Sequence, residues 1–411
     1  MKISVLISAY ACAPHKGSEP GMAWNWIINL SKYCKVFVIT EGEWQYEIER
    51  ELKNCPTREN IVFYYNNVHK KVRIMCWNQG DWRFYYHYKK WHKTSLKIAL
   101  DILNNNSIHI IHQLNMIGFR EPGFLWKIPH LPFVWGPVGG MDNIPLSFLK
   151  GSSLTNKIKC VLKNFINIIQ IRFSLRVIKA IRRANILFAA VRSVKDIVEP
   201  IYKREVILLN ETGCKVNDYI VIPKKRDTFN IVWVGKFDFR KQLNLALNVI
   251  SNLKNLEGVV FHIIGSGTKE EEERFMELSK KMGLEDITVW HGQISHNEVQ
   301  KIMRFSHLLF FTSIMEGTPH VVLEAISNNL PVVCFDTCGQ SEAVNNEVGF
   351  KINLSNPKTA ISDFTYKIRF LYENRDVLNK MSIACNARKV ELSWDSKAKI
   401  MFEYYKKSIL N

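Results

Sequence analysis

Short apolar runs alternate with amphipathic stretches along the first half of the chain. Helical patterns, such as those of residues 22–31 and 43–52, lie between the runs. The runs themselves predict buried strands over residues 3–9, 36–40, 61–65, 108–112, 133–135 and 186–190. Buried strands that alternate with helices are typical of a parallel sheet with helices on both faces. The pattern therefore predicts an α/β fold.

The same alternation restarts after about residue 204. Further buried strands are predicted over residues 206–209, 230–234, 259–264, 287–290, 308–312, 331–335 and 349–352. A chain of 411 residues exceeds the size at which a single core keeps growing, so two domains are expected. We predict them over residues 1–204 and 205–393. A last helix in residues 394–411 is expected to pack back on the first domain.

The two halves of the chain differ in charge. The formal net charge is +18, and residues 1–205 carry 30 basic and 14 acidic side chains, whereas residues 206–411 carry 26 and 24. A strongly basic surface attracts anionic partners, so the first half is expected to face one.

Cysteine usage and the absence of long apolar runs bear on location. The nine cysteines form no Cys-x-x-Cys pair, which fits reduced thiols in a cytoplasmic protein better than disulfides or a zinc site. No run of 18 apolar residues occurs, so no membrane span is expected. Residues 1–14 are interpreted as a first buried strand rather than a signal peptide.

The densest group of candidate site residues follows the predicted strand 308–312. There Thr318 and Pro319 predict the N-cap and first residue of a helix, since threonine caps well and proline lacks an N–H that would go unbonded. The N–H groups of His320 and Val321 would then point out of the positive helix end, which suits a diphosphate.

Two glutamates bracket this helix start. Glu316 precedes the cap and is placed to hold sugar hydroxyls. Glu324 lies roughly 7.5 Å beyond Pro319 along the helix axis, where its carboxylate can accept hydrogen bonds from ribose. The alternative is that Glu316 only complements the helix dipole and that Glu324 is a solvated helix residue.

A cationic loop follows the predicted strand 230–234. It carries Lys236, Arg240 and Lys241, and two fixed ammonium groups can neutralise the charge that develops on a departing diphosphate, as a metal ion does elsewhere. The sequence contains no Asp-x-Asp triplet, so a metal-independent mechanism is expected. The alternative is an ordinary basic turn.

With these motifs the second half resembles the donor domain of glycosyltransferase family 4. Glu316 and Glu324 match the family's Glu-x7-Glu element, and residues 235–242 match its Gly-Arg-…-Lys-Gly loop. Two positions depart from the family pattern, since Lys236 stands for arginine and Gln242 for glycine. Lysine keeps the charge but loses the bidentate fork of arginine.

The resemblance implies a GT-B fold, in which two Rossmann-like domains face each other across a cleft and the second binds the donor. It implies retaining transfer of a hexosyl group from a nucleotide-diphosphate sugar, which is a co-substrate, with no metal and no cofactor. It implies catalytic roles for Glu316, Lys241, Lys236 and His112. The donor-binding residues that it implies are Gly21, Lys236, Lys241, Gly265, Gly267, His291, Glu316, Gly317, Thr318, Pro319, His320, Val321 and Glu324.

In the first half, two of these assignments rest chiefly on the resemblance. Gly21 closes the loop 16–21 and matches a glycine that family members place against the donor phosphates, although Gly-Ser-Glu-Pro-Gly replaces the usual Gly-Gly. His112 ends the predicted strand 108–112, where the family commonly places a histidine near the transferred sugar. A simple turn before a helix and a structural histidine are the alternatives.

Two basic segments of the first half contain many apolar residues. Residues 156–183 hold eight cations and no acid, and residues 70–93 hold seven cations among aromatic side chains. This pattern is typical of a basic amphipathic surface and favours a peripheral enzyme on anionic lipid at the inner membrane face. Its acceptor would be a glycan or a lipid-linked saccharide in cell-surface polysaccharide synthesis, such as that of capsule or lipopolysaccharide. A solvated basic face over core aromatics is the alternative.

Other function classes fit less of the sequence. An epimerase or a phosphorylase also uses two Rossmann-like domains, but no lysine context singles out a pyridoxal-phosphate site. A basic nucleic-acid-binding protein fits a pI near 9.4 and aromatics among basic residues. It leaves the nearly neutral half with its donor motifs unexplained, so no nucleic-acid partner is expected.

Overall fold

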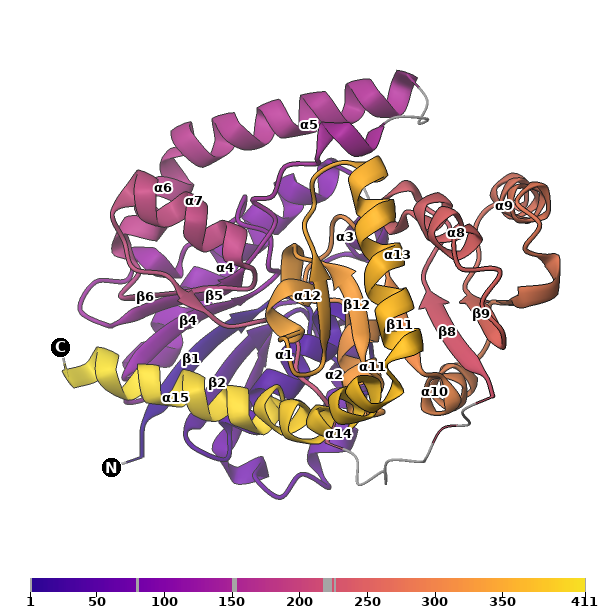
Figure 1. Cartoon of the computed structure of the whole chain (residues 1–411). Helices are drawn as coiled ribbons and strands as arrows, with labels where there is room; N and C mark the ends of the chain where they lie inside the picture. The colour runs from indigo at the N-terminus through magenta and orange to yellow at the C-terminus, as the bar shows by residue number, and fades with distance from the viewer. Residues whose placement is uncertain (1, 79–80, 150–153, 217–223, 225–226, 411) are drawn as a thin grey trace. The chain divides into compact units, whose positions relative to one another are not determined.

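The computed structural model describes residues 2–78, 81–149, 154–216, 224 and 227–410 (Figure 1). The chain divides into two compact units. Unit 1 comprises Met1–Asp142, Phe165–Thr212 and Trp394–Asn411, and unit 2 comprises Asn143–Asn164 and Gly213–Ser393. Domain boundaries were predicted only after residues 204 and 393. Asn411, the last residue of the predicted helical tail, lies outside the described residues.

Within its described residues, unit 1 holds a parallel sheet of seven strands in the order β3-β2-β1-β4-β5-β6-β7. The strands are β1 (Ser4–Ala9), β2 (Lys35–Thr40), β3 (Ile61–Tyr65), β4 (Ile110–Asn115), β5 (Phe133–Val138), β6 (Ile186–Ala189) and β7 (Ile207–Leu208). Each predicted run overlaps one of them. The strand order reverses between β1 and β4, as in Rossmann-like folds.

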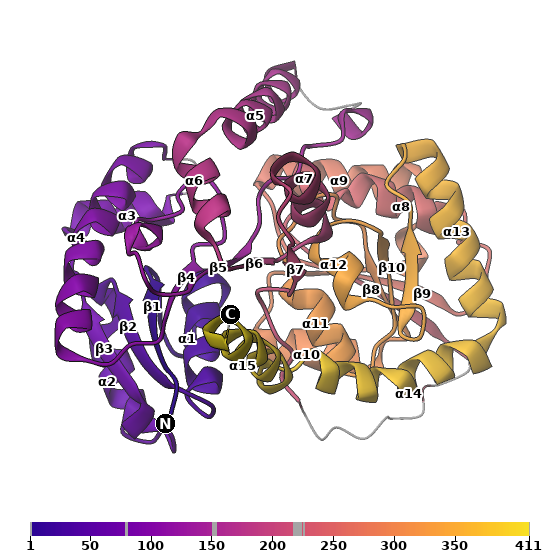
Figure 2. The ribbon, with the colours of Figure 1, turned by 90° about the vertical axis from the view of Figure 1, so that its left-hand side faces the viewer.

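Helices cover both faces of this sheet, and Figure 2 shows α1 and α4 on opposite sides of β1. One face packs against α1 (Ser18–Leu30), α2 (Gln45–Leu52) and α15 (Trp394–Leu410). The other packs against α3 (Lys70–Trp77), α4 (Arg83–Asn105), α6 (Leu175–Arg183) and α7 (Arg192–Tyr202). A further helix, α5 (Leu154–Phe173), has its first part in unit 2 and its last part in unit 1.

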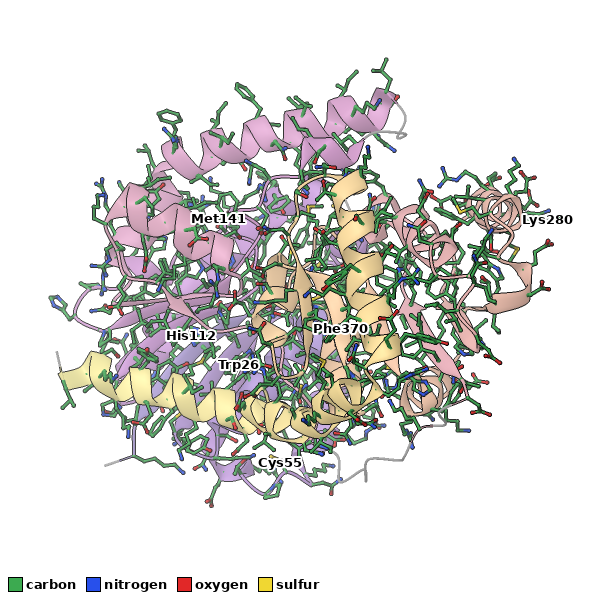
Figure 3. The ribbon with its side chains drawn as sticks, viewed as in Figure 1. Trp26, Cys55, His112, Met141, Lys280 and Phe370 are labelled. Atoms are coloured by element: carbon green, nitrogen blue, oxygen red, sulfur yellow. The ribbon has the colours of Figure 1, made fainter. Side chains whose placement is uncertain are left out.

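The terminal helix α15 is fastened to unit 1 by buried polar and aromatic contacts. The hydroxyl of Tyr405 lies 2.5 Å from Nδ1 of His112, and the ring of Trp394 meets that of Trp26 edge to face at 5.7 Å. Trp26 and His112 are labelled in Figure 3. These contacts join the terminal helix to the core of unit 1.

The loop predicted over residues 16–21 is wrong in extent, because α1 begins at Ser18, directly after the extended Gly17. Glu19 therefore lies in the first turn, where its Oε1 accepts a hydrogen bond from the Ile117 N–H at 3.0 Å. A buried carboxylate that accepts a backbone bond from another loop is a tertiary contact, which the local pattern does not reveal.

Unit 2 holds a second parallel sheet, of six strands within its described residues, in the order β10-β9-β8-β11-β12-β13. The strands are β8 (Phe229–Val234), β9 (Val259–Ile264), β10 (Thr288–Gly292), β11 (Leu308–Phe311), β12 (Val332–Phe335) and β13 (Gly349–Ile352). Each again overlaps a predicted run. Both units therefore confirm the predicted Rossmann-like architecture.

Helices also cover both faces of the second sheet. The first face packs against α8 (Leu243–Ser251), α9 (Lys269–Lys281) and α13 (Pro357–Glu373). The second packs against α10 (His296–Phe305), α11 (His320–Ser327) and α12 (Cys338–Ala343), with α14 (Arg375–Glu391) beside α11. Among all the residues described above, no helix combines the length and apolar character that crossing a bilayer requires.

The strand order of unit 2 reverses between β8 and β11, which pair in parallel with Leu308 opposite Ile231. In open α/β sheets, ligands bind outside the carboxyl ends of the strands at such a reversal. The loops that follow β8 and β11 are therefore the first place to seek a site.

Candidate functional site

The loops after β8 and β11 are tied together through their backbones. The Ile314 N–H donates to the Arg240 carbonyl at 2.9 Å. The Thr312 hydroxyl donates to the Lys241 carbonyl at 2.6 Å, and the indole N–H of Trp233 donates to the Thr312 hydroxyl at 2.9 Å. Segments more than seventy residues apart thus form one rigid surface at the reversal point.

Two predicted catalytic residues meet on this surface. Nζ of Lys241 lies 2.6 Å from Oε1 of Glu316, and both side chains are about 85% covered, with exposed fractions of 14% and 15%. The Ser313 hydroxyl donates to the same carboxylate oxygen at 2.7 Å. The ammonium group also lies 5.1 Å from the centre of the Phe311 ring. A charge pair in this setting is held in one orientation.

The three cations of the loop after β8 lie in different surroundings. Arg240 pairs with Asp238 at 2.8 Å, and the Asp238 carboxylate also accepts the N–H groups of Arg240 and Lys241. Lys236 is exposed. Lys241 is thus held by Glu316, whereas Lys236 is open to solvent and to a ligand.

The start of α11 differs by one residue from the prediction. The helix begins at His320, and Pro319 rather than Thr318 is the N-cap, with an extended backbone at ψ 118°. Thr318 is buried instead, and the N–H of Gly339 donates to the carbonyl of Gly317 at 2.9 Å. Thr318 therefore packs against the start of α12 and does not cap α11.

The amides predicted to meet a phosphate keep their place despite this shift. Val322 is the first residue of α11 whose N–H donates back to the cap, at 3.1 Å to the Pro319 carbonyl. The N–H groups of His320 and Val321 precede it, as the orphan donors of a helix start do. The His320 side chain is exposed.

Glu324 lies one turn further along α11 and contacts α10. Its carboxylate lies 3.2 Å from Nε2 of His296 and accepts a hydrogen bond from the Gln300 amide at 3.2 Å. Both partners were absent from the predicted site. They hold the carboxylate that we predicted for ribose.

The glycines after β9 allow the backbone of their loop to lie close to the backbone of the loop after β8. Gly265 has φ +135°, and a Cβ there would lie 1.8 Å from the carbonyl oxygen of Gly235. A Cβ on Gly267 would lie 2.8 Å from that of Phe237. The N–H of Gly267 donates to Glu272 at 3.1 Å. Only glycine at residue 265 lets the loop after β9 pass against the loop after β8.

His291 lies on β10 beside a histidine that sequence reasoning missed. Nε2 of His291 is 3.0 Å from Nδ1 of His262, and the two rings stack at 5.3 Å. Burial, and then the neighbouring His291, lower the pKa of His262 to about 4. His262 gave no signal because it lies inside the apolar strand β9.

In unit 1, His112 is not at a strand end as predicted, since β4 continues to Asn115. The imidazole is fully buried, and its second nitrogen, Nε2, lies 2.7 Å from the Gly136 carbonyl oxygen. Burial lowers the pKa of His112 to about 4. Its predicted place near the transferred sugar stays a prediction.

Gly21 also lies in unit 1, inside the first turns of α1. A Cβ there would lie 1.8 Å from the Lys16 carbonyl oxygen. The residue must therefore be glycine because of the chain's own fold. Contact with donor phosphates stays a prediction.

Ser313 and Gly339 were not among the predicted site residues. Ser313 follows the end of β11 by two residues, and Gly339 is the second residue of α12, which follows β12. Both therefore lie at the edge of the sheet where ligands gather. A Cβ on Gly339 would lie 2.5 Å from the Thr318 Cα, so its place against the 316–318 turn is fixed. The position after the strand was a signal that could have found both.

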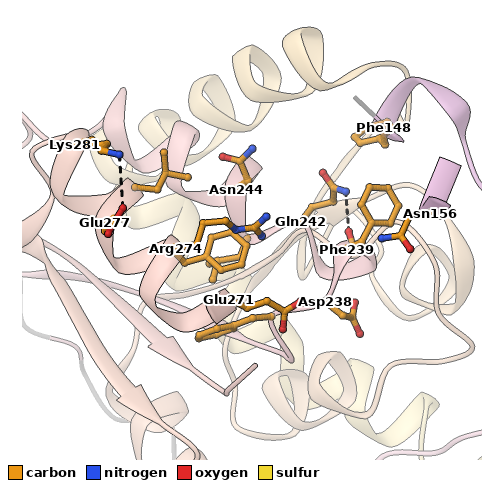
Figure 4. A pocket seen from close by; sticks show the side chains of 14 residues that line it. Phe148, Asn156, Asp238, Phe239, Gln242, Asn244, Glu271, Arg274, Glu277 and Lys281 are labelled. Atoms are coloured by element: carbon orange, nitrogen blue, oxygen red, sulfur yellow. Dashed lines mark hydrogen bonds and ion pairs between the residues drawn. The ribbon is translucent and has the colours of Figure 1, made fainter. Parts of the chain in front are cut away.

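A separate cavity of about 520 Å³ opens in unit 2 beside the cationic loop (Figure 4). Its aromatic walls include Phe237 and Phe239, and Arg274 of α9 reaches into it. Among the described residues that line it, neither Lys241 nor Glu316 occurs. The cavity is therefore distinct from the Lys241–Glu316 pair, although Asp238, Phe239 and Gln242 of the same loop line it.

With this geometry established, the chain can be compared with known proteins. Residues 219–389 match the family model described as "Glycosyl transferases group 1". Protein CapJ of Staphylococcus aureus is 29% identical over 175 residues, which are 39% of this chain and 44% of CapJ. A lipopolysaccharide 1,6-galactosyltransferase of Escherichia coli K12 is 27% identical over 134 residues, 32% of this chain and 36% of that enzyme. The chain thus spans less than half the length of these curated relatives.

Solved structures extend the fold likeness to the whole chain. The lipopolysaccharide outer core galactosyltransferase WaaB superposes with a TM-score of 0.65 at 15% identity, over 99% of both chains. HepE of Anabaena in complex with UDP gives 0.62 at 15% identity, over 99% of this chain and 100% of HepE. The GT-B fold predicted from the sequence is confirmed.

Replacing Gly265 by alanine tests the loop packing. We expect the Gly265→Ala variant to lose more than about 3 kcal/mol of stability in unit 2, since its Cβ would overlap the Gly235 carbonyl. Gly292→Ala is the matched control, because Gly292 has φ +64° but open space around it, and should cost about 1–2 kcal/mol. Urea unfolding measures both, and equal losses would contradict the packing.

Buried neutral histidines predict acid sensitivity. Burial, with Arg176 as a second cause, lowers the pKa of His92 to about 3. Burial likewise lowers the pKa values of His112 and His262, to about 4. Unfolding raises each pKa towards about 6.5, so the unfolded chain binds more protons between the two values. Stability is therefore full above about pH 6.5 and falls as the pH drops towards 4. Thermal unfolding should show a lower Tm at about pH 5 than at about pH 7, with a smaller drop in His262→Gln; an unchanged drop in that variant would contradict the role of His262.

Proposed function

We propose that this protein is a retaining glycosyltransferase that takes a sugar from a nucleotide-diphosphate donor bound on unit 2. The observation that carries the proposal is the covered Lys241–Glu316 pair at the β8–β11 reversal, beside the start of α11. A cation, a carboxylate and free helix amides meet there. This set matches the leaving diphosphate and the sugar of such a donor.

Each donor group has a candidate partner. Lys241 and Lys236 neutralise the departing diphosphate, and the N–H groups of His320 and Val321 bind its oxygens. Glu316 accepts hydrogen bonds from sugar hydroxyls. In the next turn of α11, Glu324, oriented by His296 and Gln300, accepts those of the ribose.

The reaction that these groups support is metal-independent transfer on one face of the sugar. The oriented ammonium group of Lys241, with that of the exposed Lys236, supplies the charge stabilisation that a metal ion supplies in other transferases. The acceptor hydroxyl attacks from the side on which the diphosphate leaves, so the anomeric configuration is retained without a covalent enzyme intermediate. The proton of the acceptor passes to the departing phosphate.

The nature of the substrates is suggested by the similar proteins. Structures of HepE hold UDP, glucose or UDP-glucose, so a uridine-diphosphate hexose is the first donor to test. The likeness to CapJ and to lipopolysaccharide galactosyltransferases supports an acceptor among cell-surface glycans or their lipid-linked precursors. We place the enzyme in the cytoplasm, peripheral on the inner membrane face, where such acceptors are built.

Substitution of the charge pair tests the proposed function. Glu316→Gln and Lys241→Gln keep size and hydrogen bonding but remove the charges, and we expect each to lower kcat/KM by about 100-fold or more. Release of UDP from UDP-hexoses with a saccharide acceptor measures this effect, and thermal unfolding checks the fold. Lys280→Gln, at an exposed pair with Glu285 in the same unit, is the matched control. Unchanged activity in both site variants would overturn the assignment.

A further inference from the structure

We propose that α5 is a membrane-binding helix that lies in the plane of an anionic bilayer surface, with its apolar side in the lipid. The proposal deepens the peripheral location proposed above by naming the element and the lipid chemistry. Membrane binding can be measured without catalysis. Its failure would therefore leave the transferase assignment standing.

The outward side of α5 is apolar along its whole length. Residues spaced by three or four along a helix share one face. Six large apolar side chains follow this spacing and are exposed: Leu154, Ile158, Val161, Phe165, Ile169 and Phe173. Their exposed fractions run from 41% to 73%. A contiguous apolar stripe of this size on a protein surface marks a place of contact with another apolar phase.

The opposite side of α5 is polar and holds the helix to the protein. The amide of Asn164 donates to the Ile144 carbonyl at 2.9 Å, and that of Asn167 donates to the Met141 carbonyl at 2.7 Å. Arg120 donates to Asn167 and Gln170 at 2.8 and 2.7 Å. The usual amphipathic arrangement is thus inverted, because amides face inward while Leu, Ile and Phe face outward. The residues that the structure describes leave this apolar stripe exposed, so it is available to a partner.

The charges on α5 select an anionic partner. Lys157, Lys159, Lys163 and Arg172 are its charged residues, and its sequence has no acid. Cations beside an apolar stripe are what a helix at a lipid interface carries, since the stripe enters the acyl boundary and the cations meet lipid phosphates. Four charges in twenty residues also exclude a spanning helix.

The next helix continues the same chemistry. On α6, Leu175, Lys179 and Arg182 follow the four-then-three spacing of one face, and all three are exposed. Lys179 and Arg182 also line a second hollow. The other described residues that line it are two cations, a tryptophan and a proline: Arg183, Lys127, Trp126 and Pro129. No acid occurs among these described lining residues, so this hollow fits a lipid phosphate.

A second copy of the chain is a weaker occupant than a membrane. If two copies of α5 paired through their apolar stripes, the lysine and arginine side chains of both helices would come close together with no acid on α5 to pair with them. Like charges repel, so this pairing is unfavourable. An anionic bilayer instead supplies both the apolar phase and the opposite charge.

Vesicle flotation tests the proposal with the full chain. We expect the protein to float with phosphatidylcholine vesicles that contain phosphatidylglycerol and to stay behind with phosphatidylcholine alone. The double variant Ile158→Glu/Phe165→Glu should reduce binding to the anionic vesicles by roughly tenfold or more, since each side chain contributes burial in lipid. Both sites are exposed in the protein, so the Tm should hold.

The matched control is Ile383→Glu on α14. Ile383 has an exposed fraction of 60%, close to the 59% of Ile158, but it belongs to α14 and not to the apolar stripe of α5. This variant should float like the unsubstituted protein. Equal loss in the control, unchanged flotation of the double variant, or no flotation of the unsubstituted protein would overturn the proposal. The proposal would also be overturned if light scattering showed that the unsubstituted protein is a dimer without lipid and that the double variant is a monomer.

Discussion

The parallel pairing of β8 with β11 is the constraint on which the candidate site depends. These neighbours in the sheet are far apart in sequence. The helices that follow them, α8 and α11, cover opposite faces of the sheet, and the loops that lead to these helices meet at its carboxyl edge. The carbonyls of Arg240 and Lys241 are bonded to Ile314 and Thr312, so the two loops cannot shift independently. The place of the Lys241 ammonium therefore follows from the sheet itself.

Partial burial makes the Lys241–Glu316 pair stronger and better oriented than an ion pair at the surface. In water an ion pair of this kind contributes little, whereas a covered pair keeps its direction and its charge is less screened. A cation that is already oriented by Glu316 and Phe311 need not reorganise when a phosphate charge develops beside it. Lys236, which is exposed, would gain its partner only from the ligand.

The fold was predictable because strands buried on both faces appear as continuous apolar runs, and each run in the sequence overlaps a strand. The β8 and β11 loops were predictable because catalytic residue types stood directly after such runs. The failures have a common cause. His112 lies in mid-strand, Glu19 lies in a first helical turn, and Phe84, Tyr88 and Trp91 are core residues rather than surface aromatics. Arg176, predicted on the basic surface, pairs with the buried Glu121. Each depends on a tertiary partner that a local pattern does not contain.

The same limit explains α5. Its basic, acid-free sequence indicated a surface helix, but only the structure shows that Asn164 and Asn167 face the protein while the apolar side chains face outward. Spacing alone would have turned the stripe towards the core, since most helices bury their apolar face.

The central claim, that Lys241 is set to receive a donor diphosphate, is tested most directly by titration calorimetry with UDP and UMP in the presence of a metal chelator. A charge-assisted contact to the second phosphate predicts that UDP binds about tenfold or more tightly than UMP, and that Lys241→Gln removes most of this difference. Equal affinities for UDP and UMP, or a difference that persists in Lys241→Gln, would contradict the account.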